Sequence, residues 1–428
     1  MRILVLGSGA REHAIILSLA SEDAGHEIFA APGNAGIARD ATIVALDTVD
    51  SGAVAEFAND EAIDLVVIGP EAPLVAGVAD ALRERGIPAF GPGRAAAQLE
   101  GSKAFAKRVM EAAGVPTGRA LHARTADEVA RALDEFGPPY VVKADGLAAG
   151  KGVLVSSDRD AALAHARTYL AEGAVLIEEH LVGPEVTLFF LSDGDTVRAL
   201  SPAQDYKRAF DGDVGPNTGG MGAYSPLPWL NERFGGEAEF VDLITREVAL
   251  PVVKHLDAEG TPFIGLLYTG LIVTDGGVRV IEFNARFGDP ETQVVLPRLV
   301  SPLSELLMAA ASGNLEDVPR PAFAEAVAVT VVVASEGYPA APVIGRALRG
   351  LDAAASLEGV HLAHAATAVS EAGNDGGGLI ASGGRVVDVV ALGTTFAEAR
   401  ERAYEAVDLI ELEGSHHRTD IAAGMIGR

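Results

Sequence analysis

The sequence predicts a multidomain protein of the α/β and α+β classes, with an N-terminal parallel sheet, a central α/β domain and a small C-terminal α+β domain. The 428-residue length corresponds to about three domains at roughly 150 residues each. In the first hundred residues short apolar segments alternate with helical patterns, which is typical of a parallel sheet. After residue 319 the apolar segments indicate antiparallel strands. We expect domains at residues 1–100, 101–320 and 321–428, with a smaller lobe at about 118–192.

The N-terminal domain is expected to contain five short strands, with a helix after the first. The strands are expected at residues 3–6, 27–30, 43–46, 65–68 and 89–90, and the helix at about 12–20. Ligands of parallel sheets bind beyond the carboxyl ends of the strands. Those ends are rich in turn-forming residues here, so they are candidate binding loops: residues 7–12, 32–36, 69–71 and 91–92.

The central and C-terminal regions contain strands, helices and two glycine-rich segments. Strands are expected at residues 140–144, 153–156, 174–178, 185–191, 263–273, 278–283, 326–334, 379–381 and 386–392. Helices are expected at about 102–113, 159–171, 240–256, 302–311 and 396–409. Residues 145–152 form a glycine loop between two strands. Residues 201–228 are dense in Gly, Pro, Asp and Asn, so we expect a long loop that is either functional or disordered.

Composition excludes several classes of function. The net charge of −27 disfavours nucleic-acid partners, because an acidic surface repels phosphates. The absence of cysteine excludes disulfides, thiolate metal sites and cysteine nucleophiles. No targeting pattern is visible, and the longest apolar stretch is about half a membrane span, so a cytoplasmic protein without a membrane partner is expected. An acidic chain with only six lysines suits high salt; we expect a halophilic source, with ordinary acidic composition as the alternative.

Residues 7–12 have part of a dinucleotide-binding pattern. Gly7 and Gly9 follow a strand, but Glu12 stands where the third glycine is required. The second strand also lacks an acidic residue at its end to hold a ribose. The segment therefore lacks two features that a nicotinamide dinucleotide site requires. Backbone N–H groups and Arg11 still suit a phosphate or small molecule; the alternative is a plain tight turn.

Two lysines flank the glycine loop at residues 145–152. Lys143 precedes the loop and Lys151 lies within it. Gly152 follows Lys151 where a P-loop requires Ser or Thr, and the segment joins two strands, which argues against a P-loop. A flexible hairpin with these charges suits a flap that closes over a triphosphate. The alternative is a solvent-exposed hairpin.

Residues 282–291 combine a carboxylate, an amide, a guanidinium and a second carboxylate. Glu282 and Asn284 are two apart on a strand and so share a face. Their oxygens suit Mg²⁺ bound with phosphates. Arg286 and Asp289 follow closely. The alternative is a strand end with a salt-bridged turn. The histidines lack zinc-site spacing and are expected to be surface or hydrogen-bonded residues: His13, His180, His416 and His417.

These motifs together resemble the ATP-grasp superfamily and, within it, the phosphoribosylamine–glycine ligase family. The broader likeness is carried by Lys143, Lys151-Gly152-Val153, Glu178-Glu179-His180-Leu181, Glu185 and Glu282-Phe283-Asn284-Ala285-Arg286. The narrower likeness is carried by residues 7–13, 69–74, 215–223 and 286–291. The resemblance implies a pre-ATP-grasp domain, a central ATP-grasp fold and a small C-terminal domain.

The resemblance also implies a reaction of purine biosynthesis and its ligands. ATP, glycine and 5-phosphoribosylamine would give ADP, phosphate and glycinamide ribonucleotide through glycyl phosphate, with Mg²⁺ or Mn²⁺ and in a monomer or weak homo-oligomer. Both the glycine carboxylate and the triphosphate are anionic, so the metal and the lysines must neutralise their repulsion. The loop at residues 145–152 would exclude water from glycyl phosphate.

The resemblance assigns site residues by role. Lys103 and Lys143 would bind ATP phosphates, and Glu178 with the backbone of residues 179–181 would contact adenine. Glu185 would hold the ribose. The full ATP set is Lys103, Lys143, Gly146, Gly150, Lys151, Gly152, Glu178, Glu179, Leu181 and Glu185. Glu282 and Asn284 would hold the metal, without an acidic ligand on the preceding strand. Arg286, Asp289 and Asp213 would be catalytic, Asp213 as a proton acceptor. The substrates would contact Gly9, Arg11, Glu12, Gly69, Pro70, Glu71, Asp205, Lys207, Asn217, Thr218, Gly219 and Gly220.

Two other functions remain open from the sequence. One is a different ATP-grasp ligase, such as an aminoimidazole ribotide carboxylase or a biotin carboxylase, which shares the flap and the metal carboxylate. Residues 215–223 and 286–291 favour the glycine ligase instead. The other is a nucleotide-binding module without catalysis. The charged residues that follow Asn284 argue against it, because binding alone does not require them.

Overall fold

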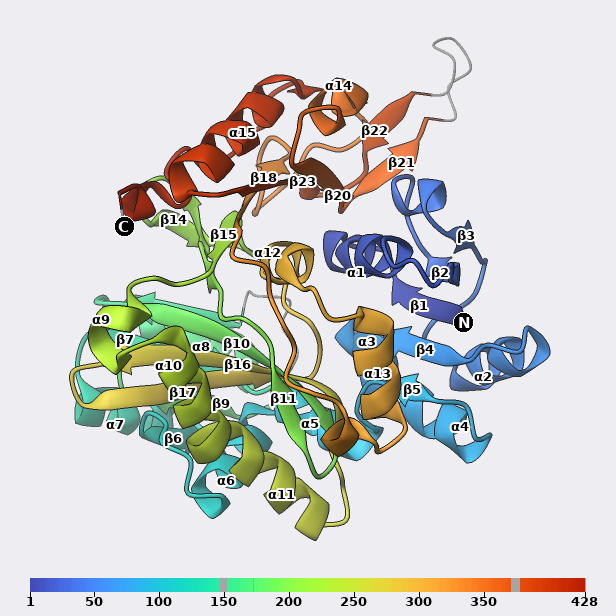
Figure 1. Cartoon of the computed structure of the whole chain (residues 1–428). Helices are drawn as coiled ribbons and strands as arrows, with labels where there is room; N and C mark the ends of the chain where they lie inside the picture. Colours follow the sequence, from blue (N-terminus) through green and yellow to red (C-terminus); the bar gives the residue numbers. More distant parts are fainter. Residues whose placement is uncertain (147–151, 172, 371–377, 428) are drawn as a thin grey trace.

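The computed structural model describes residues 1–146, 152–171, 173–370 and 378–427. Its N-terminal part, drawn in blue in Figure 1, contains a parallel five-stranded sheet with the order β3-β2-β1-β4-β5. The strands are β1 (Arg2–Gly7), β2 (Glu27–Pro32), β3 (Thr42–Ile43), β4 (Leu65–Ile68) and β5 (Ala89–Phe90). The helices are α1 (Ala10–Ala20), α2 (Ser51–Asp60), α3 (Glu71–Ala76), α4 (Val78–Glu84) and α5 (Arg94–Gly101). Because the strand order reverses between β1 and β4, the loops after these strands open at one point of the sheet edge.

The third strand was expected at residues 43–46, and this prediction of its bounds is wrong, because β3 comprises Thr42–Ile43. Only Thr42 and Ile43 pair with β2, and both are exposed. The strand lies at the edge of the sheet, where little apolar burial favours extending it.

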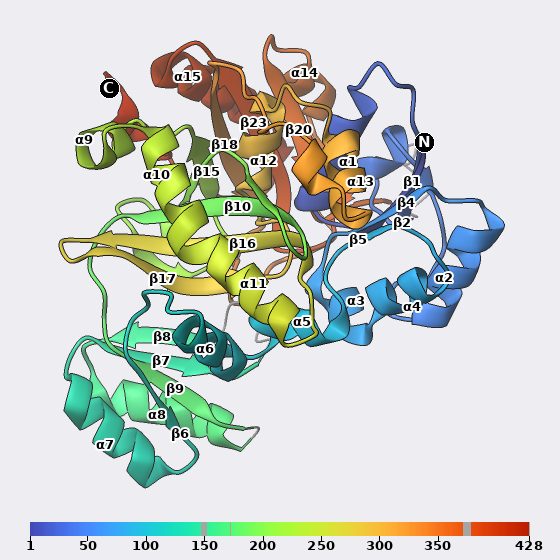
Figure 2. The same ribbon diagram turned by 60° about the horizontal axis from the view of Figure 1, so that its bottom comes forward.

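The central part holds two antiparallel sheets that face each other across the middle of the molecule (Figure 2). The small sheet has the order β6-β9-β7-β8 and two covering helices: β6 (Ala120–Ala123), β7 (Tyr140–Ala144), β8 (Val153–Ser156), β9 (Val175–Glu178), α7 (Ala126–Phe136) and α8 (Arg159–Leu170). The large sheet has the order β11-β10-β16-β17: β10 (Glu185–Asp193), β11 (Val197–Ala199), β16 (Ile264–Thr274) and β17 (Gly277–Asn284). The associated helices are α6 (Lys103–Ala112), α9 (Leu230–Phe234), α10 (Glu237–Ile244), α11 (Leu250–Ala258), α12 (Thr292–Val295) and α13 (Leu303–Ala311).

The single helix expected at residues 240–256 is interrupted. A π-helical turn, Thr245–Ala249, separates α10 from α11. Pro251 lies at the start of α11. Proline has no N–H to donate, and its ring clashes with the carbonyl four residues earlier. The wider turn accommodates this residue without ending the helix.

The long loop expected at residues 201–228 contains four short strands instead. They are β12 (Gln204–Asp205), β13 (Arg208–Phe210), β14 (Val214–Asn217) and β15 (Gly222–Ser225). β13 and β14 pair with each other, whereas β12 and β15 join the C-terminal sheet in the order β12-β15-β18-β23-β20. β15 pairs with β18, about a hundred residues away in sequence, and β12 joins the sheet through β15, so the local composition does not reveal these strands. This part of the central segment thus belongs to the C-terminal sheet.

The C-terminal part is antiparallel, as expected. Its strands are β18 (Val327–Ala334), β19 (Ala347–Arg349), β20 (Val360–His364), β21 (Thr367–Val369), β22 (Leu379–Ala381), β23 (Arg385–Gly393) and β24 (Glu411–Leu412), and its helices are α14 (Leu351–Ala355) and α15 (Phe396–Asp408). A second sheet has the order β21-β22-β19-β24.

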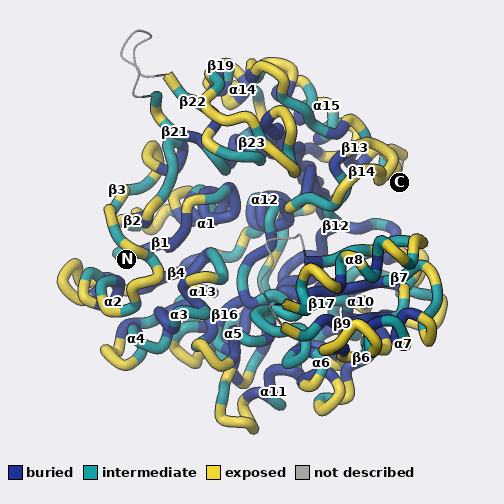
Figure 3. The backbone as a smooth tube through the Cα atoms, turned by 180° about the vertical axis from the view of Figure 1, so that it is seen from behind, coloured by how far each residue is buried: buried dark blue, intermediate teal, exposed yellow. Residues whose placement is uncertain are grey.

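Buried apolar side chains pack the N-terminal part, the large central sheet and the C-terminal part against one another. The largest apolar cluster takes residues from all three, and α12 is fully buried between them (Figure 3). The small sheet and its helices have a separate core, which is suited to a lobe that moves as a unit. No helix of the described chain has the length and apolarity needed to cross a bilayer.

Candidate active site

A cleft of about 530 Å³ lies where the parts of the molecule meet. The N-terminal part contributes Arg11, Glu71 and Glu100, and β23 contributes Arg385. The segment at 201–228 contributes Asp205, Lys207, Asn217, Thr218 and Gly219. The two central sheets and the segments next to them contribute Lys103, Lys143, Gly146, Gly152, Tyr268, Glu282, Asn284, Arg286, Asp289 and Glu291. Most of the motifs selected from the sequence therefore share one cavity.

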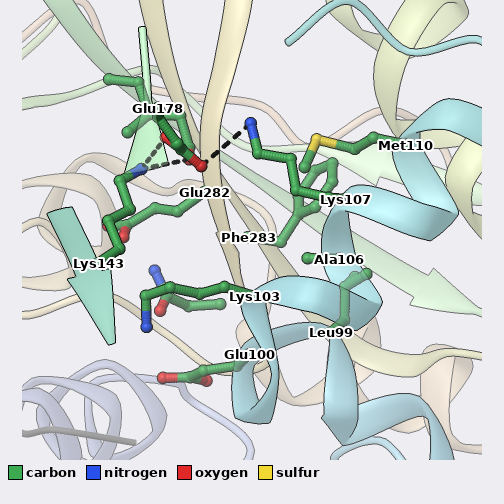
Figure 4. Close-up of a pocket in the computed structure, with 12 residues that line it drawn as sticks. Leu99, Glu100, Lys103, Ala106, Lys107, Met110, Lys143, Glu178, Glu282 and Phe283 are labelled. Atoms are coloured by element: carbon green, nitrogen blue, oxygen red, sulfur yellow. Dashed lines mark hydrogen bonds and ion pairs between the residues drawn. The ribbon is translucent and has the colours of Figure 1, made fainter. Parts of the chain in front are cut away.

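Lysines gather around one buried glutamate in a smaller cavity that adjoins the cleft (Figure 4). Glu178 Oε2 is 2.6 Å from Lys143 Nζ, and its Oε1 is 3.2 Å from Lys107 Nζ. Lys103 Nζ donates to the Gly146 carbonyl at 3.1 Å. Burial lowers the pKa of Lys103 and of Lys107. Glu282 and Glu100 line the same cavity, and Glu100 is paired with Arg286. Three ammonium groups therefore face two remaining carboxylates, which leaves this corner able to bind an anion such as a phosphate chain.

Glu282 and Asn284 lie two residues apart on β17 and both line the cleft. Within the described chain, neither side chain makes a hydrogen bond or an ion pair. Burial alone would raise the pKa of Glu282, but nearby positive charges outweigh this effect and lower it: Lys207, Lys143 and Lys103. An ionised carboxylate beside a free amide oxygen is a donor set that fits a hard divalent cation.

Arg286, which follows β17, connects this strand to the N-terminal part. Its Nη2 is 3.0 Å from Glu100 Oε1 in α5, and its Nε is 4.0 Å from Glu71 Oε2 in α3. Burial would lower the pKa of Arg286, but these two carboxylates raise it. The guanidinium is therefore a fixed positive charge at the wall of the cleft.

Asp205 and Lys207 face the cleft from the segment that joins the C-terminal sheet. Lys207 Nζ is 4.0 Å from Asp205 Oδ1 and is also ion-paired with Glu185 of β10. Burial raises the pKa of Asp205 to about 7, and the negative charges of Glu291 and Glu185 add to the effect of burial, against the opposing charge of Lys207. Asp205 is thus an acid that changes its protonation state near neutral pH.

Asp289 is held by an arginine that sequence reasoning did not select. The two terminal nitrogens of Arg385 lie 3.1 Å from the two carboxylate oxygens of Asp289. Arg385 Nη1 also donates to the Gly219 carbonyl at 2.6 Å. A Cβ at Gly220 would lie 2.3 Å from Cδ of Pro290, so only glycine lets the two loops approach this closely. The loops at residues 217–220 and 286–291 are therefore fixed together.

The loops after β1 and β4 meet around Glu12 and not around an open pocket. Glu12 is 2% exposed, and its Oε2 accepts the Gly9 N–H at 2.7 Å. A Cβ at Gly69 would lie 2.2 Å from Glu12 Oε1. Glu12 therefore fills the position that a third glycine leaves open in dinucleotide sites. Arg11 lines the cleft and donates to the Phe287 carbonyl at 3.3 Å.

Several expected site residues lie outside the cleft lining. Gly150 and Lys151 lie outside the described residues. The Asp213 carboxylate is 2.7 Å from Arg418 Nη1 at the β13–β14 hairpin, and its side chain is 70% exposed. The Glu179 N–H donates to the Arg119 carbonyl at 3.0 Å, so that backbone group is already satisfied. The other expected residues absent from the lining are Gly9, Glu12, Gly69, Pro70, Glu178, Leu181, Glu185 and Gly220.

The histidines do not form a metal site. His13 is buried: its Nε2 is 3.0 Å from Asp40 Oδ2, and its Nδ1 accepts the His364 N–H at 2.8 Å. Among the residues that the structure describes, no group of three or more His, Cys, Asp or Glu could hold a metal ion. A cation in the cleft would therefore depend on Glu282 and Asn284 together with ligand oxygens.

Glu100 and Arg385 are two charged cleft residues that sequence reasoning missed. Glu100 ends a helix without a motif around it, and Arg385 begins a C-terminal strand. Only the pairing of β23 with β18 brings Arg385 to Asp289. No local sequence signal marks either residue.

Three family models match the chain in succession. They describe the N domain (residues 1–100), the ATP-grasp domain (101–292) and the C domain (328–424) of phosphoribosylglycinamide synthetase. The phosphoribosylamine–glycine ligase of Leifsonia xyli is 66% identical over 99% of this chain and 100% of its own. The crystal structure of the Thermotoga maritima phosphoribosylamine–glycine ligase has 32% identity and a TM-score of 0.81, over 98% of this chain and all of its own. The biotin carboxylase domain of the Hydrogenobacter thermophilus 2-oxoglutarate carboxylase shares the fold, with a TM-score of 0.68 and 18% identity over 97% of this chain and 91% of its own.

Proposed function

The chain belongs to the phosphoribosylglycinamide synthetase family, and we propose that it joins glycine to 5-phosphoribosylamine while ATP is converted to ADP and phosphate. The product is glycinamide ribonucleotide, an intermediate of purine biosynthesis. The observation that carries the proposal is the shared cleft, in which charged residues from all three parts face one cavity. Three reactants that all carry charged groups must meet in one such cavity.

The ATP phosphates bind at the lysine corner, which is the smaller cavity lined by Lys103, Lys107 and Lys143. Lys103 and Lys143 supply positive charge there, supported by the adjoining Lys107. Glu282 and Asn284 hold a divalent cation, Mg²⁺ or Mn²⁺, which neutralises charge on the phosphates when bound. From the sequence we keep the expectation that the loop at residues 145–152 excludes water from the reacting groups, although residues 147–151 lie outside the described part of the chain.

Glycine binds as a zwitterion between Arg286 and Asp289. The fixed guanidinium of Arg286 attracts the carboxylate, and the Asp289 carboxylate accepts hydrogen bonds from the ammonium group. A glycine carboxylate oxygen attacks the γ-phosphorus of ATP, the bond to the ADP oxygen breaks, and glycyl phosphate forms. Positive charge around the transferring group stabilises this step electrostatically.

The amine of phosphoribosylamine then attacks the carbonyl carbon and displaces phosphate. Asp205 replaces Asp213 as the proposed acceptor of the amine proton, because Asp205 faces the cleft whereas Asp213 is paired with Arg418 outside it. A carboxyl that titrates near neutral pH is well matched to this role. Arg11, at the start of α1, and Glu71, at the start of α3, approach the acceptor from the N-terminal part.

The test is phosphate release from ATP with each candidate acceptor. We expect release only when glycine and freshly generated phosphoribosylamine are both present, with glycinamide ribonucleotide identified by mass spectrometry. Turnover with bicarbonate but not with glycine would favour the carboxylase alternative. ATP binding without release in any mixture would favour a binding module.

A further inference from the structure

A buried acid of the C-terminal sheet reaches the glycine-binding wall through one amide. Gln293 Nε2 donates to Asp289 Oδ1 at 2.9 Å and to Asp388 Oδ2 at 2.7 Å. Asp388 lies on β23, three residues after Arg385, and Gln293 lies on α12. Both Asp388 and Gln293 are completely buried.

The surroundings of Asp388 favour a neutral carboxyl group. Among the described residues no cation lies within 4.0 Å of it, and its Oδ1 has no hydrogen-bond partner. Arg385, the nearest positive charge, is committed to Asp289. An ionised, unpaired carboxylate in this position would be costly. Burial and the negative charge of Asp289 raise the pKa of Asp388 to about 8, against the opposing effects of Arg385 and Gln293.

We propose that Asp388 is a positioning residue for glycine binding: it orients Gln293, which with Arg385 fixes the Asp289 carboxylate at the cleft wall. The amide of Gln293 has two N–H donors, and both are used when Asp388 and Asp289 are its acceptors. Without the Asp388 acceptor, one buried donor is unsatisfied and the amide is free to turn away from Asp289. The inference rests on the proposed function, because it assigns Asp289 to glycine.

This arrangement extends the role of the C-terminal part beyond closing the cleft. β23 supplies both Arg385, which contacts Asp289 directly, and Asp388, which acts through Gln293. Arg385 from β23 and Gln293 from α12 therefore contact the same carboxylate from different elements. A displacement of Asp289 would affect glycine, while the lysine corner that binds ATP contains none of these residues.

The experiment compares Asp388→Asn, Asp388→Leu, Gln293→Met and the double variant Asp388→Leu/Gln293→Met by steady-state kinetics and thermal melting. Asparagine keeps the acceptor oxygen without charge, so Asp388→Asn is expected to stay within 3-fold of the unaltered enzyme. Asp388→Leu and Gln293→Met are each expected to raise the glycine KM about 5- to 10-fold, with the ATP KM within 2-fold. Because both act through one contact, the double variant is expected to be no worse than the worse single variant.

Three results would overturn the inference: an unchanged glycine KM in Asp388→Leu and Gln293→Met, an Asp388→Asn variant as impaired as Asp388→Leu, or additive effects in the double variant. If Asp388→Leu does not fold, Gln293→Met and Asp388→Asn decide the question by the same criteria. An unaltered enzyme that does not use glycine would refute the proposed function and this inference together. Normal glycine use with unaffected variants would refute the inference alone.

Discussion

Replacing Asp388 with asparagine is expected to change how the stability of the protein depends on pH. In the folded protein the pKa of Asp388 is raised from its ordinary value of 3.8 to about 8, chiefly by burial. Between these values the folded protein retains a proton that the unfolded chain has released. Raising the pH through this window therefore favours unfolding. Asparagine cannot ionise, so this contribution disappears in Asp388→Asn.

The size of the effect follows from proton linkage. One bound proton corresponds to about 1.4 kcal/mol of unfolding free energy for each pH unit. Between pH 5.5 and 7.5 the unaltered protein is expected to lose about 2 to 3 kcal/mol more stability than Asp388→Asn, slightly less than two full units because the folded group begins to release its proton at the upper end. Below the unfolded pKa, near 4, the contribution is fully present and no longer depends on pH, because both states are protonated.

The assay is urea unfolding at pH 5.5, 6.5 and 7.5, followed by fluorescence of Trp229, the single tryptophan, which is buried. Asp257→Asn is the matched control, because Asp257 is exposed on α11 and the substitution removes the same charge. The control curve is expected to run parallel to that of the unaltered protein. A parallel curve for Asp388→Asn as well would refute the reasoning, since it would mean that the buried acid does not hold its proton.

Four further outcomes are expected. Glu282→Gln should lower turnover by about 100-fold or more, because the ionised cation ligand is lost; phosphate release measures this, and near-normal turnover in a folded variant would contradict the metal assignment. Glu178→Gln should destabilise the protein by about 3 kcal/mol in urea unfolding, because Lys143 and Lys107 lose their shared partner; an unchanged midpoint would show that these ammonium groups are solvated. The rate should rise with pH through about 7, where Asp205 loses its proton, and Asp205→Asn should remove that rise; an identical pH profile would exclude Asp205 as the proton acceptor. The net charge of −27 should make the melting temperature higher in 2 M KCl than in 0.1 M KCl, because salt screens self-repulsion; a lower value would contradict the expected salt preference.

Local patterns were sufficient for the regular elements of the fold. The strands at Ile3, Val67 and Val142 lie in apolar segments whose burial alone favours extended structure, and the structure contains strands there as β1, β4 and β7. The pairing of Glu282 with Asn284 on one face also followed from the two-residue period of a strand. The segment at 201–228 was mispredicted, because β15 is held by the distant β18 and β12 by β15, not by their own composition.

The candidate site divides in the same way. Lys103, Lys143 and Arg286 carry motifs and were selected from the sequence, and all three line the cleft. Glu100 and Arg385 carry no motif. Glu100 nevertheless holds the guanidinium of Arg286 in position, and Arg385 holds the carboxylate of Asp289. Their importance depends on contacts between distant segments, which a single sequence does not reveal.

By itself, the sequence determined the classes of the elements, the charged motifs and the family to which they belong, because these depend on residue type and short-range spacing. Tertiary structure alone decided which charges are paired and which remain free. Asp213 forms an ion pair with Arg418, whereas the side chains of Glu282 and Asn284 are unpaired within the described chain. The reason is physical: the reactivity of an ionisable group depends on its burial and on its neighbours within a few ångströms, and in this fold those neighbours come from the far end of the chain.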